Sequence, residues 1–316
     1  MQRLFLLLLA CCASVAGYGL LFGSVVSRPL VVDEVAKMLR VKLAYASETA
    51  SPKIFVIAGS NARFSHSCAV IEQRLQRPCV NLGISAEVGL DWVLDASRPH
   101  MRAGDIVYVP LELGAYSSTR SEMFTGFDAA YRWRHDKLSL LSRGPEGVVR
   151  AMFMFDLPTL VDSLVEMALA ADGFRRRVGV ATLNAQGDEI GHTDEAAKVY
   201  EGFLRTLVYE YPEPDHLLDD PDGEQTALVA FLDWCRTNGV TAVGGLPTTV
   251  DDKKHSDLLV ETLRGFYAKN GAEFIALPNR SQYPRQMFFD TPMHLRQSAQ
   301  MAHSELVADA LRPFVR

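Results

Sequence analysis

The sequence predicts an α/β domain built on a doubly wound parallel sheet, preceded by one apolar helix. Three observations support this prediction. The first residues contain a long stretch without charge. Further along, short apolar runs that end in small residues alternate with amphipathic segments of helical length. The links between these runs are short, as they are in sheets whose two faces are covered by helices.

Residues 1–28 contain an uncharged stretch between Arg3 and Arg28. As a helix it would be roughly 36 Å long, enough to cross a hydrocarbon core of about 30 Å. Arg3 and the terminal amine favour a cytoplasmic N-terminus, which places the rest of the chain outside. We interpret the segment as a signal-anchor. The alternatives are a signal peptide cleaved after Ala16 and a lipoprotein acylated at Cys11, and both also export the domain.

Residues 29–52 are expected to form a helical connector, and residues 53–316 the α/β domain. Continuous apolar runs are predicted as strands, because strands buried on both faces of a parallel sheet have this pattern. Amphipathic segments between them are predicted as helices. The predicted strands are 53–59, 78–83, 104–113, 240–247 and 272–278, and the predicted helices are 65–76, 86–97, 224–239, 255–271 and 298–311.

The alternation stops between about residue 116 and residue 220. This part of the chain is predicted to contain helices and loops, including an amphipathic run at 157–171. We therefore expect a helical insertion after the third strand, placed as a cap over the carboxyl edge of the sheet.

Composition excludes some classes of function. The net charge of the 316 residues is −6, and no segment is rich in Lys and Arg, so nucleic acid is not an expected partner. Cys68, Cys79 and Cys235 lie outside the leader. A predicted helix of about three turns should hold Cys68 and Cys79 roughly 15 Å apart, so we expect free, buried thiols. No Cys/His cluster has metal-ligand spacing, and no metal site is predicted.

Polar residues follow three of the predicted strands. They are Ser60 after the first strand, Asn81 and Gly83 after the second, and Asp290 and His294 after the last. In open α/β sheets, ligands bind outside the carboxyl ends of the strands. A serine at a strand-to-helix turn can act as a nucleophile if a histidine takes its proton and an aspartate orients the imidazole. The sequence therefore predicts a Ser60–His294–Asp290 constellation.

These residues lie in short segments that resemble the SGNH (GDSL-like) hydrolase superfamily. The likeness is greatest to its exported, membrane-anchored members found with bacterial cell-surface polysaccharide modification. The segments are GSNARFSH (59–66), VNLGISAEVGL (80–90), GDIVYVPLELGAY (104–116), FFDTPMHL (288–295) and, inside the insertion, LNAQGDEIGH (183–192). The resemblance implies an SGNH-like variant of the flavodoxin-like doubly wound sheet.

The resemblance also implies roles for particular residues. Ser60 matches the nucleophile, His294 the general base and Asp290 its orienting acid. Gly83 matches a glycine whose N–H would join that of Ser60 in an oxyanion hole. Where the family supplies an asparagine from a third block, this chain has Glu112, a carboxylate that cannot donate unless protonated.

The sequence departs from the family pattern at the oxyanion hole and in the spacing of the aspartate and the histidine. With Glu112 in the third block, the oxyanion hole has two donors, or takes another from the side chain of Asn61 or Asn81. The family usually has Asp-x-x-His, whereas Asp290 and His294 are separated by one residue more. Three residues are expected to line the pocket and contact substrate, namely Asp188, His192 and Glu112.

The implied function is an exported, serine-dependent acyl esterase or O-acyltransferase that acts on a cell-surface polysaccharide. Its expected partners are an acylated polysaccharide or acyl donor and a membrane-bound O-acyltransferase or polysaccharide synthase. No cofactor is implied, and the expected location is the inner membrane with the domain in the periplasm. The alternative is a non-catalytic accessory or glycan-binding protein that keeps the scaffold.

The other histidines receive structural interpretations. Asp252 and His255 have Asp-x-x-His spacing, but they precede a predicted helix and are interpreted as its cap and as solvated charge. His66 is expected to begin the first helix of the domain. Four histidines are interpreted as surface residues, namely His100, His135, His216 and His303.

Overall fold

The computed structural model describes residues 2–26, 30–116, 126–155, 157–171, 179–210, 217–218 and 224–315. Within the chain, contacts define two compact units. The helical unit combines Met1–Ala36 with Phe124–Arg176, and the α/β unit combines Lys37–Met123 with Arg177–Arg316. Helix α2 (Leu30–Glu48) begins in the first unit and continues into the second.

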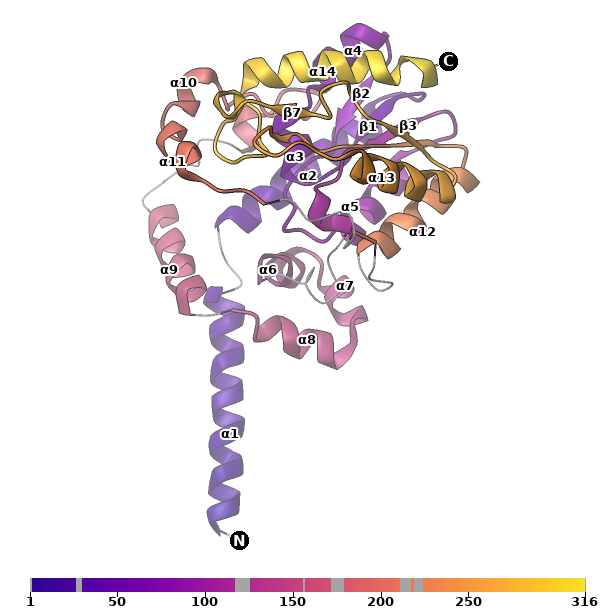
Figure 1. Ribbon diagram of the computed structural model, residues 1–316. Coiled ribbons are helices and arrows are strands. Elements are labelled where there is room, and N and C mark those ends of the chain that lie inside the picture. The colour runs from indigo at the N-terminus through magenta and orange to yellow at the C-terminus, as the bar shows by residue number, and fades with distance from the viewer. Residues whose placement is uncertain are drawn as a thin grey trace. The chain divides into compact units, whose positions relative to one another are not determined.

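The α/β unit contains a five-stranded sheet in the order β2-β1-β3-β4-β6, and every pairing is parallel (Figure 1). This order corresponds to the 2-1-3-4-5 arrangement of doubly wound sheets. All five predicted strands are confirmed, each shorter than its apolar run. They are β1 (Ile54–Val56), β2 (Cys79–Asn81), β3 (Ile106–Val109), β4 (Thr241–Gly245) and β6 (Glu273–Ile275).

Strands β1, β2 and β3 are buried along their whole length, which explains why their sequence does not alternate. Strand β4 ends in two glycines because aromatic rings lie against it. A Cβ at Gly244 would come within 2.4 Å of the Tyr267 ring, and one at Gly245 would come within 2.2 Å of Tyr108 Oη.

Helices cover the sheet as the alternating pattern predicts. Helix α14 packs against α3 and α4, and α12 packs against α5 (Figure 1). A two-stranded parallel sheet of β5 and β7 was not predicted, because its strands have two residues each. The bounds are α3 Ser60–Ser65, α4 Cys68–Leu75, α5 Leu90–Ser97, η2 Arg98–His100, η3 Leu113–Tyr116, η4 Val180–Thr182, α10 Asp194–Ala197, α11 Glu201–Thr206, α12 Glu224–Thr237, β5 Thr249–Val250, α13 Asp257–Lys269, β7 Gln282–Tyr283, η6 Arg285–Met287, α14 Gln297–Leu311 and η7 Arg312–Phe314.

Cys68 and Cys79 form a disulfide, with a Cα–Cα separation of 5.0 Å, so the expectation of two free thiols is wrong. The helix predicted over 65–76 is shorter in the structure, where α4 has only eight residues. Gln76, in the left-handed conformation, ends α4 and lets the chain turn back. Cys79 therefore returns beside the first turn of α4. Disulfides are typical of exported domains.

The later part of the insertion belongs to the α/β unit. The N–H of Asn81 donates to the carbonyl of Gln186, which joins the 183–192 segment to the carboxyl end of β2. Asp188 in this segment accepts bonds from the N–H groups of Cys68 and Ala69 at the start of α4. This segment is thus part of the domain core.

The earlier part of the insertion clusters with the N-terminal helix. The helical unit contains α1 (Gln2–Leu21), η1 (Phe22–Val26), α6 (Gly126–His135), α7 (Lys137–Ser142), α8 (Gly144–Met152) and α9 (Leu157–Ala171). Among the described residues, the helical stretch Gln2–Val26 is long and apolar enough to cross a membrane.

Candidate active site

Ser60 is the first residue of α3, directly after β1 and Gly59. Because β1 lies between β2 and β3, this turn opens at the point where the strand order reverses, where doubly wound sheets bind ligands. A Cβ at Gly59 would lie 2.6 Å from Ala86 Cα and 2.6 Å from Glu112 Oε1. The residue before Ser60 must therefore be glycine for the turn to stay this tight.

Glu112, which follows β3, lies over the N-terminus of α3. Its carboxylate accepts hydrogen bonds from the N–H of Gly59 (3.1 Å) and from that of Asn61 (2.9 Å). A negative charge is favourable there, because the first N–H groups of a helix have no partner within the helix. Glu112 thus occupies two of the amides nearest to Ser60.

His294 and Asp290 form the predicted pair. Nδ1 of His294 lies 2.7 Å from Oδ1 of Asp290. The carboxylate accepts, so Nδ1 carries the proton and Nε2 of a neutral ring is left as the basic nitrogen. Since no other described residue bonds to Nε2, it can accept a proton from a nucleophile.

The His294 ring packs against α3, the helix that Ser60 begins. It stacks on Phe64, with ring centroids 4.3 Å apart. Phe64 follows Ser60 by four residues in the same helix, and residues at this spacing are neighbours on one helix face. Ser60 and His294 come from opposite ends of the chain and both lie at α3, but within the described ranges no hydrogen bond joins the Ser60 hydroxyl to His294.

Buried polar bonds fix the loop of His294 to α3. The side chain of Asn61 donates to the carbonyls of Thr248 (3.0 Å) and Met293 (2.9 Å). The hydroxyl of Ser65 donates to the same Met293 carbonyl and accepts from the N–H of Leu295. The residues on both sides of His294 are therefore held by α3, and the Asn61 side chain is used for this purpose.

The predicted oxyanion donors after β2, Asn81 and Gly83, also already make hydrogen bonds. The N–H of Gly83 donates to Asn81 Oδ1 (2.9 Å), and Asn81 Nδ2 donates to the carbonyls of Ala62 and His66. A Cβ at Gly83 would come within 2.3 Å of the backbone nitrogen of Arg63, so the absence of a side chain at this position allows the loop to pack on α3. Of the proposed donors, the Ser60 N–H alone makes no hydrogen bond within the described ranges.

Asp188 and His192 differ in what they can offer to a substrate. Asp188 is fully buried, and its oxygens accept from the α4 N-terminus, Ser67 and Asn184, so they are already satisfied. His192 contacts Phe64 edge-on, and neither of its ring nitrogens has a partner in the described structure. Burial lowers the pKa of His192 to about 3, so its ring is neutral at neutral pH.

Lys42 is a residue near the site that sequence reasoning missed. Its ammonium is fully buried and donates to the Gly83 carbonyl (2.5 Å). Burial, reinforced by the Arg63 charge, lowers the pKa of Lys42 to about 7, while Asp188 and Glu189 oppose this shift. The available signal was its position in α2, one helical turn after Met38 and Leu39 on a buried face.

Two interpretations of other histidines are wrong. His303 is fully buried rather than exposed, with Nδ1 2.8 Å from the Tyr283 hydroxyl and Nε2 3.2 Å from His66 Nε2. His66, also buried, lies between α3 and α4 and begins neither helix. His216 lies outside the described residues, whereas His100 and His135 are partly exposed.

Asp252 and His255 do not form a second catalytic pair. Asp252 pairs with Arg285, while Nε2 of buried His255 contacts the Thr249 hydroxyl at 3.0 Å. The cap of α13 is Ser256, so neither residue has the capping role that was expected.

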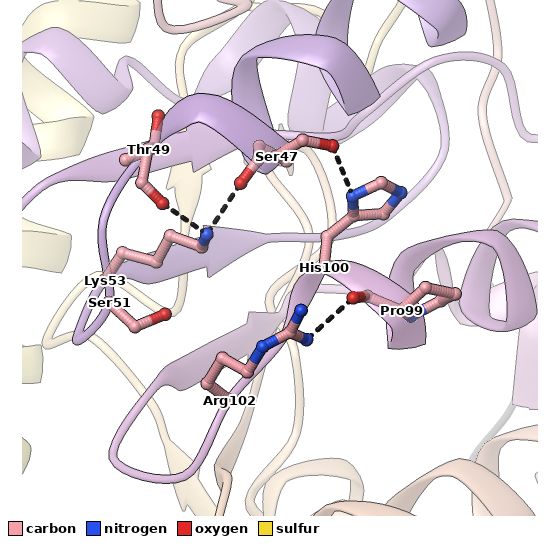
Figure 2. A pocket seen from close by; sticks show the side chains of 8 residues that line it. Ser47, Thr49, Ser51, Lys53, Pro99, His100 and Arg102 are labelled. Atoms are coloured by element: carbon pink, nitrogen blue, oxygen red, sulfur yellow. Dashed lines mark hydrogen bonds between the residues drawn. The ribbon is translucent and has the colours of Figure 1, made fainter.

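A polar cavity of about 360 Å³ lies at the opposite edge of the sheet (Figure 2). Lys53 and Arg102, which precede β1 and β3, line it, and both donate to backbone carbonyls. Ser47 contacts Nδ1 of His100 at 2.8 Å, but the Ser47 hydroxyl proton is donated to the Leu43 carbonyl. Ser47 must therefore accept from His100, and the imidazole does not act as its base.

Comparison of the chain with protein-family models, with curated proteins and with solved structures gave no match. The described residues contain no group of three or more His, Cys, Asp or Glu side chains arranged to hold a metal ion. What the arrangement offers is a serine hydroxyl that bonds to no other described residue, an imidazole at the same helix whose Nε2 is likewise unbonded among the described residues, and a carboxylate that orients the imidazole.

Proposed function

We propose that this chain is a membrane-anchored, serine-dependent acyl esterase or O-acyltransferase that acts on acyl groups of a cell-surface polysaccharide. The observation that carries the proposal is the Asp290–His294 pair, stacked on Phe64 one helical turn from Ser60. This combination of nucleophile, base and orienting acid is the one that ester chemistry requires.

The first half-reaction transfers the acyl group to the enzyme. Ser60 Oγ bonds to the carbonyl carbon of the ester while Nε2 of His294 takes the hydroxyl proton. The tetrahedral intermediate then expels the sugar oxygen, which receives that proton from His294. Asp290 stabilises the imidazolium between the two transfers. The product is an ester on Ser60.

The second half-reaction returns the enzyme to its resting state. An acceptor hydroxyl gives its proton to His294 and bonds to the acyl carbon. Collapse of the intermediate breaks the bond to Ser60 Oγ, which regains the proton. Water as acceptor makes the protein a deacylase, and a sugar hydroxyl makes it a transferase. A transferase fits a partnership with a membrane-bound O-acyltransferase or a polysaccharide synthase, which supplies the acyl group or the glycan.

Two features support an extracytoplasmic location, on the periplasmic side of an inner membrane. Gln2–Val26 is a candidate membrane span with Arg3 at its start, which favours a cytoplasmic N-terminus. The Cys68–Cys79 disulfide in the α/β unit is stable in oxidising compartments. Both features favour an anchored domain outside the cytoplasm.

A second candidate is a non-catalytic accessory protein that binds the acylated glycan. The observation that favours it is the engagement of the amides of Gly59 and Asn61 by Glu112 and of the Gly83 amide by Asn81. An oxyanion hole that lacks one donor typically loses about 10²–10³ in turnover. On this alternative, Ser60 and His294 contact the sugar without chemistry.

Turnover of p-nitrophenyl acetate by the full chain in detergent micelles tests the choice between these functions. We expect hydrolysis that is lost in Ser60→Ala and in His294→Ala, because either change removes the nucleophile or its base. Matched controls are Ser47→Ala and His100→Ala, which alter the other serine–histidine contact and should retain turnover. A folded protein whose turnover is unaffected by Ser60→Ala would reject the catalytic proposal.

A further inference from the structure

Helix α9 exposes an apolar face, and polar side chains lie on the opposite face. Leu157, Val161, Leu164 and Val165 follow the i, i+4, i+7, i+8 spacing of one helix face, and all are exposed, Leu157 by 70%. On the opposite face, Ser163 is buried and Glu166 accepts a hydrogen bond from the N–H of Val31. This polarity is the reverse of that of a surface helix in water.

Neighbouring helices extend the apolar surface. Leu138 and Leu141 of α7 and Val149 of α8 are also exposed, as is Phe153 directly after α8. Helices α6, α7 and α8 pack against one another. We call the exposed apolar residues of α7, α8, α9 and Phe153 the apolar collar. Large exposed apolar surfaces on a protein mark contact sites.

The apolar collar is continuous with the far end of the candidate membrane span. Tyr18, near the end of α1, stacks on Phe153 with centroids 4.8 Å apart. Phe22 of η1 packs against Trp133 and Phe155, and α9 also packs against η1. All of these residues belong to the helical unit, where Figure 1 shows α8 and α9 beside the end of α1 that is remote from the N-terminus.

The depth of this junction follows from the length of α1. A helix from Gln2 to Leu21 is roughly 30 Å long, which matches the hydrocarbon core, so Tyr18 and Phe22 reach its outer boundary. Aromatic side chains concentrate at such boundaries. Trp133, which lies against Phe22, also has the Lys137 ammonium over its ring at 5.6 Å. A basic group beside an aromatic ring is typical of the headgroup region.

We propose that the apolar collar lies in the lipid of the outer leaflet, so that α7, α8 and α9 form a monotopic attachment around the outer end of α1. The helix α9 is too short to span a bilayer at roughly 22 Å, but a helix of this kind can lie in the interface plane with its apolar face buried. This attachment is independent of the proposed catalysis. It requires only that Gln2–Val26 crosses the membrane.

Spin-label accessibility in lipid nanodiscs tests the proposal on the full chain. The label is placed by Leu164→Cys in a Cys11→Ala/Cys12→Ala background, and buried Cys235 is left in place. The matched control is Leu258→Cys on α13 of the α/β unit, since Leu258 is 55% exposed and Leu164 is 49% exposed. A label on the native Cys11 and Cys12 reports whether α1 is in the bilayer.

We expect the label at position 164, like the labels on Cys11 and Cys12, to collide often with oxygen and rarely with a water-soluble nickel chelate. The label at position 258 should collide freely with nickel. Nickel collisions at 164 that equal those at 258 overturn the proposal. Dipolar broadening of the label at position 164 also overturns the proposal, because it indicates that a second copy of the chain covers this face. Protection of the label from nickel in native membranes but not in lipid nanodiscs overturns it as well, because it indicates that another protein covers the face.

Discussion

At the N-terminus of α3, the Glu112 carboxylate accepts from the amides of Gly59 and Asn61, which flank the Ser60 amide expected to bind a developing oxyanion. Its negative charge also opposes the negative charge of a tetrahedral intermediate. In a catalytic cycle, the Glu112 side chain must therefore move away from α3 when the acyl group enters.

Replacing Glu112 by glutamine is expected to raise esterase turnover. The Glu112→Gln side chain keeps one acceptor for an amide, loses the charge and gains N–H donors. We therefore expect turnover to rise by about tenfold or more, up to the factor of about 10²–10³ that one oxyanion donor contributes. Steady-state kinetics on the full chain measures this, with the melting temperature as the control for folding. A stable variant with lower turnover would mean that the carboxylate itself is needed.

Lys42 predicts a pH dependence of stability. The pKa of Lys42 is about 7 in the folded protein, whereas an unfolded lysine titrates near about 10.4. Between these values the unfolded chain binds more protons, so the contribution of Lys42 to the free energy of unfolding rises with pH. Between pH 7 and pH 9 this rise is about 2 kcal/mol for the single group.

Denaturant titrations followed by tryptophan fluorescence measure this contribution as the difference between the wild type and Lys42→Met. We expect the difference to change with pH by the amount given, and the exposed Lys254→Met to show no such change. If the difference in unfolding free energy between the wild type and Lys42→Met is constant from pH 7 to pH 9, the lowered pKa of buried Lys42 is contradicted.

Residue patterns identified the Asp290–His294 contact but not the state of the oxyanion donors. A histidine and an aspartate after the last predicted strand are expected at the carboxyl edge of the sheet, and the structure shows that their side chains are in contact there. Whether the amide of Gly83 is free depends on the rotamer of Asn81, and that depends on Ala62 and His66 of a different segment. Such networks of buried polar groups are not visible in a linear pattern.

Among the elements, the five strands were predictable because continuous apolar runs leave few alternatives in a parallel sheet. The start of α4 at Cys68, three residues later than the predicted start at residue 65, was not predictable from periodicity. It depends on Ser67, whose hydroxyl accepts from the Val70 N–H, and on Asp188, which accepts from the first amides of α4. The disulfide was missed for the same reason, since the predicted helix was too long.

The disulfide is expected to stabilise α4 and its connection to β2. It closes a loop with a sequence separation of 11, for which chain entropy gives about 2–3 kcal/mol. We expect reductant to lower the melting temperature of the wild type, and Cys68→Ser/Cys79→Ser to start at the lower value and not respond to reductant. Equal melting temperatures for reduced and oxidised wild type would contradict this contribution.

At the scale of the whole molecule, the two parts of the insertion belong to different compact units. Residues 124–176 cluster with the N-terminal helix, and the residues after them join the α/β unit. The sequence indicated the insertion through the break in alternation, but it predicted a single cap. The exposed apolar face of α9 looks like an ordinary amphipathic run in the sequence, because periodicity does not show which face is buried.

The division into units gives the account its overall form: a helical unit that contains the membrane span, and an α/β unit that carries Ser60, His294 and Asp290. An enzyme of this form would act on glycans close to the membrane surface. The proposed acyl-transfer reaction depends on whether Ser60 is a nucleophile.

Mass spectrometry of the full chain after reaction with a fluorophosphonate tests this claim most directly. The account predicts one covalent adduct, on the peptide that contains Ser60, formed in the wild type and in Ser47→Ala and absent from His294→Ala. A folded wild-type protein that gains no adduct, or gains it on another residue, would contradict the account and favour the glycan-binding alternative.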